Sequence, residues 1–245
     1  MQAVVESRML EFQEDGLLVR TLCKESELKA SYRLRHKVFA ERLQWVGTSG
    51  DGIEVDSYDA FAASVGLFDE HHQLRGVFRM VNQPYPFMIE SEFQACLLSG
   101  CKIRKERDTA EITRLTLDPT LTDRGLSNRL MQVLFKGVYQ WSMLNEIRFL
   151  YMVVEKRFLR ALRGMGFTCE AVSPAVALPP AGALSIAAVL DWKKFHEICQ
   201  EKQPSFFQWI TTVDGSTSFR RSQFLARDPK CEPWGVHEPA TLVSV

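Results

Sequence analysis

Apolar residues recur three or four positions apart in two long segments of the chain. The first segment covers residues 25–44 and the second covers residues 121–146. This spacing puts the apolar side chains on one side of a helix, where they can pack against a sheet. In the second segment, the stripe that we expect to be buried consists of Leu126, Leu130, Leu134, Val138 and Trp141. The sequence therefore predicts two main helices.

Other segments alternate apolar and polar positions, which is typical of half-buried strands. These segments are residues 16–22, 62–70, 73–81 and 110–118. Residues 147–155 are almost continuously apolar, which predicts a strand that is covered on both faces of a sheet. Shorter segments predict three further helices, over residues 87–98, 156–167 and 192–202, and two final strands, over residues 168–174 and 184–192.

Helices and strands that alternate in this order predict an α/β (α+β) domain. We expect three layers, in which a mixed sheet is flanked by helices. A chain of 245 residues is long enough to bury a substantial core in one domain. We assign that domain to residues 1–201, and residues 202–245 form a C-terminal extension of unknown role.

Charge and composition exclude several classes of partner. The formal net charge is zero, so no overall field favours a nucleic acid or a membrane surface. The longest apolar stretch, residues 171–190, contains three prolines and does not predict a membrane span. The six cysteines are scattered without a CxxC pair, which indicates free thiols in a reducing compartment. The start of the chain lacks a signal-peptide pattern, and we therefore expect a cytoplasmic protein.

Eight charged and aromatic residues form one ordered series that begins in the first predicted main helix and ends before the second. They are Arg35, Phe39, Trp45, Asp56, Asp59, Arg79, Glu111 and Arg114. The spacing R-x3-F-x5-W-x10-D-x2-D, followed by an Arg at the end of a strand and by E-x2-R, resembles the signature of the acyl-homoserine-lactone synthases. All eight positions carry the residue type that is expected of these autoinducer synthases.

The resemblance implies both a fold and a reaction. The fold would be that of the Gcn5-related N-acetyltransferases. The enzyme would transfer an acyl group from acyl carrier protein, or from acyl-CoA, to the amine of S-adenosylmethionine. Lactonisation would then release methylthioadenosine and a quorum-sensing signal. Ring closure needs little more than proximity, so we expect neither a metal nor a cofactor.

The first three residues of the series suit S-adenosylmethionine, the acceptor of the acyl group. A cation over an aromatic face is attracted by about 0.5–2 kcal/mol, so Phe39 and Trp45 could hold the sulfonium. Arg35, on the same helix face as Phe39, could bind the carboxylate through a two-pronged contact. Each aromatic residue alone would more often be a packing residue, and it is the complete series that favours a site.

The next residues suggest a cluster of opposite charges. Asp56 and Asp59 could form a solvated loop pair, or they could lie beside Arg79 and Arg114 under the acceptor. We favour the cluster, because acids and arginines satisfy each other where water is excluded.

Glu111 has two possible roles. It could act as general base towards the acceptor amine, of which roughly a tenth is already neutral at pH 7. Alternatively, it could only pair with an arginine as a structural support. Glu111 and Arg114 are three positions apart in a predicted strand, so they should point to opposite faces unless a bulge re-aims one of them.

The acyl side of the site is less defined by the sequence. Aligned with the family, Met152 occupies a strand position where enzymes that make 3-oxoacyl products tend to carry Thr. Methionine cannot donate a hydroxyl hydrogen bond, so we expect a product without a 3-oxo group. Acyl carrier protein is acidic, and two basic clusters, over residues 102–107 and 156–163, could dock it.

Two other interpretations stay open. The first is another acyltransferase of the same superfamily, either exosortase-associated or acyl-CoA-dependent. The acyl-CoA-dependent enzymes normally show R/Q-x-x-G-x-G/A before the long helix, where backbone amides hold pyrophosphate, and residues 123–128, DRGLSN, match this poorly. The second is a non-enzymatic domain with the same fold. We would expect such a domain to have lost part of the series, but none of it is missing.

Overall fold

A computed structural model describes residues 7–98 and 100–213 of the protein. Nine strands form one sheet, which is antiparallel except where β5 and β6 run parallel. In sheet order the strands are β1 (Glu11–Glu14), β2 (Leu17–Thr21), β3 (Ala63–Phe68), β4 (Leu74–Asn82), β5 (Thr109–Leu117), β6 (Phe149–Glu155), β9 (Ala183–Asp191) and β7 (Cys169–Ala171), and β8 (Val176–Leu178) also pairs with β9.

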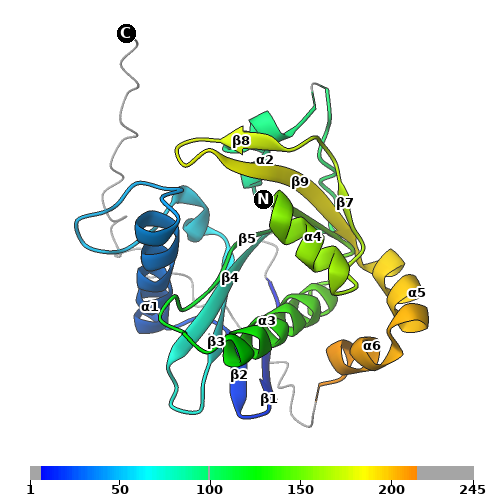
Figure 1. The fold of residues 1–245 in the computed structure, drawn as a ribbon, viewed down its shortest axis with the longest axis horizontal. Helices are drawn as coiled ribbons and strands as arrows, with labels where there is room; N and C mark the ends of the chain where they lie inside the picture. The colour runs from blue at the N-terminus through cyan, green and yellow to red at the C-terminus, as the bar shows by residue number, and fades with distance from the viewer. Residues whose placement is uncertain (1–6, 99, 214–245) are drawn as a thin grey trace, which may run out of the picture.

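Most of the helices lie between these strands in the chain, and the last two follow β9 (Figure 1). They are α1 (Glu25–Arg35), its π-helical continuation η1 (His36–Arg42), η2 (Ser57–Ala60), α2 (Met88–Ser91), η3 (Gln94–Cys96), α3 (Arg124–Leu144), α4 (Lys156–Gly164), α5 (Trp192–Lys202) and α6 (Pro204–Thr211).

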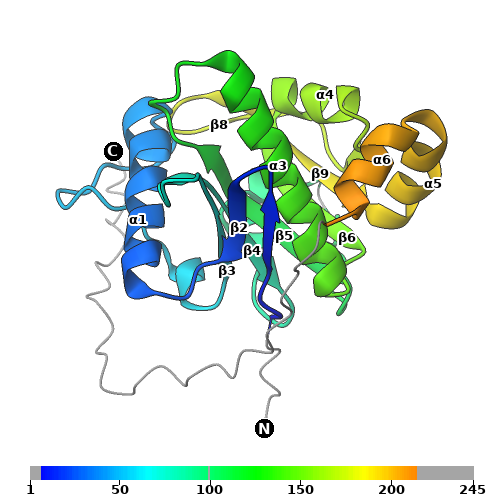
Figure 2. The same cartoon turned by 90° about the horizontal axis from the view of Figure 1, so that it is seen from below.

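Alternation along β4 separates the two faces of the sheet. Phe78 and Met80 belong to the large core that α3 covers. Val77, the residue before Phe78, instead packs with Leu34 of α1 and Val38 of η1. The two main helices therefore cover opposite faces, as Figure 2 shows from below. The predicted three-layer arrangement, a mixed sheet flanked by helices, is confirmed.

Three local predictions need correction. Leu126 lies in the first turn of α3 and is 45% exposed, whereas the other four residues of the predicted stripe are buried. Residues 87–98 form a four-residue helix and a short 3-10 turn instead of one helix, because the chain leaves helical geometry at Phe93. The strands β1 and β8 were not predicted, and both are short edge elements.

The strands β5 and β6 diverge along their length. They pair only from Thr109 to Glu111 and from Phe149 to Tyr151, although β5 continues to Leu117 and β6 to Glu155. The prediction that β6 is buried on both faces therefore holds for its first half, while Val153 to Glu155 are half-buried. Divergence leaves space between two neighbouring strands, and this space becomes part of the site.

The described part of the C-terminal extension packs against the domain. Trp209 in α6 donates a hydrogen bond of 2.7 Å to Glu14 in β1, and Glu14 pairs at 2.5 Å with the buried Lys136 of α3. Ile210 is fully buried in the main core. The helix α6 therefore shares the core of the domain, and residues 214–245 of the extension lie outside the described residues.

Candidate active site

Three arginines and three carboxylates form a buried cluster on the face of the sheet that α1 covers. The arginines are Arg35, Arg79 and Arg114, and the carboxylates are Glu54, Asp56 and Asp59. Their formal charges cancel, so that the group as a whole is neutral. We refer to these six residues as the ion cluster.

Asp56 and Asp59 hold two arginines through forked contacts. Arg79 donates to both oxygens of Asp56 and lies 3.0 Å from Asp59, while Arg35 donates to both oxygens of Asp59 at 2.6 and 2.9 Å. The aspartates also cap η2: the Asp56 side chain accepts from the N–H of Tyr58, and the Asp59 side chain accepts from the N–H of Asp56. The structure thus brings together the two acids and two of the arginines that the sequence singled out.

Arg35 does not lie where the sequence led us to expect it. Its side chain is fully buried, and its Nε, Nη1 and Nη2 atoms all donate to Glu54 or Asp59. A ligand carboxylate would have to displace one of these contacts to reach it. Arg35 therefore holds Glu54 and Asp59 through ion pairs, and its binding of the acceptor stays a prediction.

A bulge in β5 changes the direction of Arg114. Two residues, Arg114 and Leu115, lie opposite the single residue Phe78 of β4, and Arg114 has a φ of +55°. This left-handed backbone is uncommon for an arginine. As a result Arg114 points to the same face as Glu111, where it donates to Glu54 and Asp56. The alternative that a bulge re-aims one of the pair is the one that the structure shows.

Sequence reasoning missed Glu54. This carboxylate is 6% exposed and receives hydrogen bonds from both Arg35 and Arg114. Burial alone raises the pKa of Glu54, but the charges of Arg114 and Arg35 outweigh it and hold that pKa below its ordinary value. The expected cluster paired two aspartates with two arginines, and a third acid is needed because Arg35 also lies in it.

The carboxylate of Glu111 is held by backbone N–H groups and not by the arginines of the ion cluster. It is fully buried, and its two carboxylate oxygens accept from the backbone N–H groups of Met88 at 2.5 Å and Ile89 at 2.8 Å. Burial raises the pKa of Glu111 to about 7, although these two hydrogen bonds and the charge of Arg79 oppose the shift. Glu111 thus fixes the start of α2, and its carboxyl keeps its proton to a higher pH than an exposed glutamate does.

Met88 connects Glu111 with the ion cluster. Its sulfur accepts from Arg79 at 3.1 Å and contacts Arg114 at 3.9 Å, while its N–H donates to Glu111. Met88 therefore contacts both the carboxylate of Glu111 and two arginines of the ion cluster.

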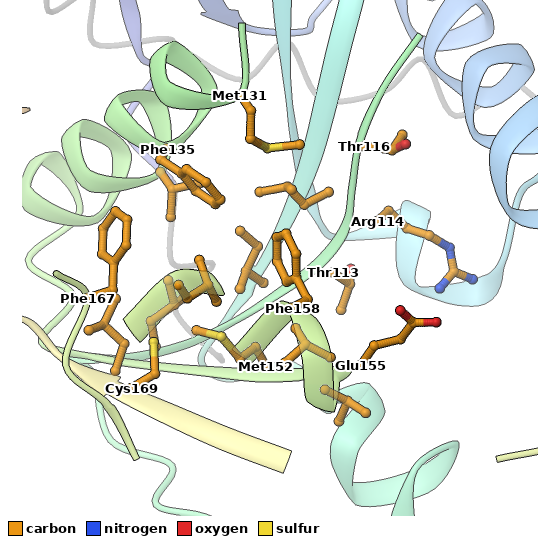
Figure 3. Close-up of a pocket in the computed structure, with 18 of the residues that line it drawn as sticks. Thr113, Arg114, Thr116, Met131, Phe135, Met152, Glu155, Phe158, Phe167 and Cys169 are labelled. Carbon is orange, nitrogen blue, oxygen red and sulfur yellow. The ribbon is translucent and has the colours of Figure 1, made fainter. Parts of the chain in front are cut away.

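An apolar cavity of about 270 Å³ lies between the diverging halves of β5 and β6. Figure 3 shows Thr113, Arg114 and Glu155 on one side of the cavity. On the other side lie Phe135, Phe167 and Cys169. The cavity therefore has a polar end next to the ion cluster and an apolar interior, and Met152 lines it as the sequence led us to expect.

Phe39 and Trp45 line the polar end of the same cavity, with their ring centroids 6.0 Å apart. The guanidinium of Arg114 lies 5.5 Å from the centre of the Phe39 ring. One face of Phe39 is thus already occupied by a cation, whereas Trp45 is half-buried. The more accessible aromatic surface at this end belongs to Trp45.

Comparisons with known proteins show which family the chain belongs to. The sequence model of the autoinducer synthase family matches residues 20–194. An acyl-homoserine-lactone synthase of Rhizobium radiobacter is 29% identical over 181 residues, which cover 72% of this chain and 84% of the relative.

Two solved structures share the fold. The AHL synthase LasI has a TM-score of 0.67 at 18% identity, over 77% of this chain and 95% of LasI. BjaI, a CoA-dependent acyl-homoserine lactone synthase solved with SAM and isopentyl-CoA, has a TM-score of 0.61 at 22% identity, over 76% of this chain and 82% of BjaI.

The chain has the mixed-sheet fold of the Gcn5-related architecture, with a cavity beside a bulged strand. Within that architecture, this chain belongs to the autoinducer synthase family. The family and the type of enzyme predicted from the sequence, an acyl-homoserine-lactone synthase, are confirmed.

The structure bears only in part on the predictions about metals, membranes and location. Among residues 7–98 and 100–213, no group of three or more His, Cys, Asp or Glu side chains could hold a metal ion. No helix in the same part of the chain is both long and apolar enough to cross a membrane. The cytoplasmic location, the absence of a cofactor and the lack of a nucleic-acid partner stay predictions.

Proposed function

We propose that the protein joins an acyl group, held in the cavity between β5 and β6, to the α-amine of S-adenosylmethionine bound at the polar end. The amine attacks the thioester carbonyl and the donor thiol leaves. The methionyl carboxylate then attacks its own γ-carbon, which closes the lactone and releases methylthioadenosine. The observation that carries this proposal is the apolar cavity that ends beside the ion cluster.

Arg114 is the arginine best placed to meet the acceptor. It lines the cavity, and its Nε and Nη2 atoms are held by Glu54 and Asp56. Its Nη1 contacts the sulfur of Met88 at 3.9 Å, which is a weak partner for a guanidinium. This Nη1 could donate to the acceptor carboxylate, while the face of Trp45 accommodates the sulfonium. Arg114 thereby binds the acceptor carboxylate, which the sequence pattern assigned to the fully buried Arg35.

The geometry favours a positioning role for Glu111. Both of its oxygens are engaged by backbone N–H groups, and Glu111 does not line the cavity. A strong base is not required, because roughly a tenth of a free α-amine is neutral at pH 7. Glu111 then supports Met88, and through Met88 the two arginines. The raised pKa of Glu111 keeps proton transfer as the second possibility, which the pH dependence below separates.

Acyl carrier protein is the donor that the surface favours. The carboxylate of Asp123 caps α3 and occupies the N–H groups of Gly125 and Leu126, where a pyrophosphate would otherwise bind. The helix α4 begins at the cavity, since Glu155 and Phe158 line it, and exposes Lys156, Arg157, Arg160 and Arg163. An acidic carrier protein could dock there with its thioester directed into the cavity.

The second basic cluster is less suited to docking. Arg104 is paired with Glu106 and Asp108, and Lys105 is paired with Glu90. Its positive charge is therefore partly cancelled by neighbouring acids. We place the docking surface on α4 rather than on residues 102–107.

The product of this enzyme would lack a 3-oxo group. Met152 is 5% exposed and lines the cavity, where its thioether offers no donor to a second carbonyl. The wall around it is largely apolar, which suits an unsubstituted acyl chain.

Expression in a heterologous bacterium, with mass spectrometry of extracts of the medium, tests the proposal. The scan follows the homoserine lactone fragment that all such products share. We expect acyl-homoserine lactones without a 3-oxo group, and their loss when Arg114 is replaced by Met. Soluble protein that yields no lactone in a host with a broad acyl supply would overturn the lactone synthase. Thiol release from acyl-CoA and acyl carrier protein donors by the purified protein then identifies the donor.

A further inference from the structure

A second cavity lies directly behind the first. It has a volume of about 200 Å³ and is lined by Gln132, Phe135, Met165, Phe167, Gln203 and Phe206. Phe135 and Phe167 line both cavities. The two cavities are therefore separated by these two aromatic rings. We refer to Phe135 and Phe167 as the aromatic wall.

The aromatic wall lies at the inner end of the acyl cavity. Figure 3 places Phe135 and Phe167 on the side opposite Arg114 and Glu155, where the reacting atoms would lie. An acyl chain that enters with its thioester at the polar end points its tail towards the wall. The rings are 5.4 Å apart between centroids and both are buried. At this spacing the two rings are in contact and leave no room for a chain to pass between them.

The far side of the second cavity comes from the C-terminal extension. Gln203 and Phe206 belong to the turn before α6 and to α6 itself, both beyond the matched family residues 20–194. The Phe206 ring packs edge-on against Phe167 at 5.8 Å, so α6 supports the wall from behind. The far side of the space behind the wall is therefore built by a segment outside the matched region.

We infer that the aromatic wall sets the longest acyl chain that the enzyme uses, and that removing it joins the second cavity to the acyl pocket. This inference rests on the proposed function, because it assigns an acyl tail to the first cavity. Chains that end before the wall fit without rearrangement. Longer chains must displace Phe135 or Phe167, and an apolar pocket discriminates by roughly 10-fold or more for each methylene that does not fit.

Phe135 is the better of the two wall residues to change. Phe167 also packs against Trp192, Phe195 and Phe206, so its loss would disturb several rings at once. Phe135 packs against the rings of Phe158 and Phe167. Phe135→Ala opens the wall, and Phe135→Leu opens it partly with less loss of packing.

The test compares lactone products from one host strain, so that every variant draws on the same acyl pool. We expect Phe135→Ala to raise the ratio of long-chain to short-chain lactones by roughly 10-fold or more over the unmodified protein. Phe135→Leu should shift the ratio in the same direction by less. Gln132→Ala is the matched control: it changes a side chain of the second cavity and leaves both rings of the wall and Phe206 in place, so the ratio should not change.

A double variant tests where the longer tail goes. Gln132 is exposed on α3 and lines the second cavity but not the first. Gln132→Trp should fill the second cavity, leave the product ratio of the unmodified protein unchanged, and cancel the shift caused by Phe135→Ala. A shift that persists in the Phe135→Ala, Gln132→Trp protein would mean that the tail does not enter the second cavity.

The outcomes separate this inference from the proposed function. If the unmodified protein makes no lactone, the proposed function fails before the wall is tested. If it makes lactones, and soluble Phe135→Ala and Phe135→Leu proteins give the same chain-length ratio, the wall does not set the length. Should Phe135→Ala be insoluble, Phe135→Leu decides alone, and an unchanged ratio overturns the inference.

Discussion

The ion cluster and the acyl cavity lie on either side of Arg114 and differ in almost every physical respect. In the cluster, three arginines and three carboxylates occupy one another's hydrogen-bonding groups without any ligand. In the cavity, about 270 Å³ is enclosed by mostly apolar side chains. The charged groups of the ion cluster are already paired with one another, whereas the cavity is open to an acyl chain.

This difference indicates how each region tolerates change. Removing one member of a paired set leaves a buried charge behind, so the cluster should respond as a unit. Changing one side chain of an apolar cavity alters its volume and shape, which changes the preferred acyl group more than the reaction. We expect the cluster to determine whether the enzyme works and the cavity to determine which product it makes.

The largest expected effect is in the cluster. Replacing Arg79 with Ala leaves three buried carboxylates with two arginines, and should lower the free energy of unfolding by roughly 3–5 kcal/mol. Urea denaturation measures this. Arg75→Ala on the same strand is the control, because its pairs with Asp69 and Asp118 are part-exposed and should contribute less than about 1 kcal/mol. Equal losses in the two proteins would show that the cluster is not a special unit.

The second effect concerns Glu111, whose folded pKa of about 7 lies above its ordinary value of 4.5. Below pH 4.5 the carboxyl is protonated in both states; as the pH rises to 7, the unfolded chain loses the proton first. The unfolding free energy of the unmodified protein, relative to Glu111→Gln, should therefore fall by roughly 3 kcal/mol over that range and stay level above it. A difference that does not vary with pH would contradict the raised pKa.

Activity measurements on the same Glu111→Gln protein separate its two roles. A positioning residue should leave the shape of the kcat/KM profile against pH unchanged while lowering its height. A general base should remove the acidic limb of the profile. The circular dichroism spectrum of the variant must match that of the unmodified protein before either role is assigned, because a misfolded variant would also lose activity.

The third effect lies at the boundary between the two regions. Arg114→Lys keeps the charge but loses the forked contact with Glu54, and hydrogen bonds to charged groups contribute about 1.5–3 kcal/mol each. We expect kcat/KM for S-adenosylmethionine to fall by roughly 10- to 100-fold. Arg148→Lys, which alters a forked pair with Asp191 away from the cavity, should leave it unchanged. Similar losses in both would point to a general effect of losing a guanidinium.

The smallest effect lies inside the cavity. Met152→Thr introduces a hydroxyl donor and should raise the proportion of 3-oxoacyl lactones by roughly 10-fold, with little change in total product. Met152→Leu removes the thioether without adding a donor, so its product profile should stay as it is. Mass spectrometry of the medium reads both. An equal shift in the two variants would attribute the effect to volume rather than to the hydroxyl.

The signature residues could be found from the sequence because their chemical types are unusual together. A buried cluster needs arginines and acids in matching number, and the series from Arg35 to Arg114 supplies most of them in order. Glu54 escaped notice, since nothing in its local sequence distinguishes it from the other acids of the same loop. Only the packing of that loop against Arg35 and Arg114 shows that a third acid completes the charge balance.

The sequence by itself determined the layers of the fold, the residue types of the site and the family, because these depend on periodicity and on side-chain chemistry. The tertiary structure decided which way those side chains point. The bulge turned Arg114 to the face of Glu111, burial enclosed Arg35, and the divergence of β5 from β6 opened the cavity. Each of these depends on contacts between segments far apart in the chain, where pairing and exclusion of water outweigh the local pattern.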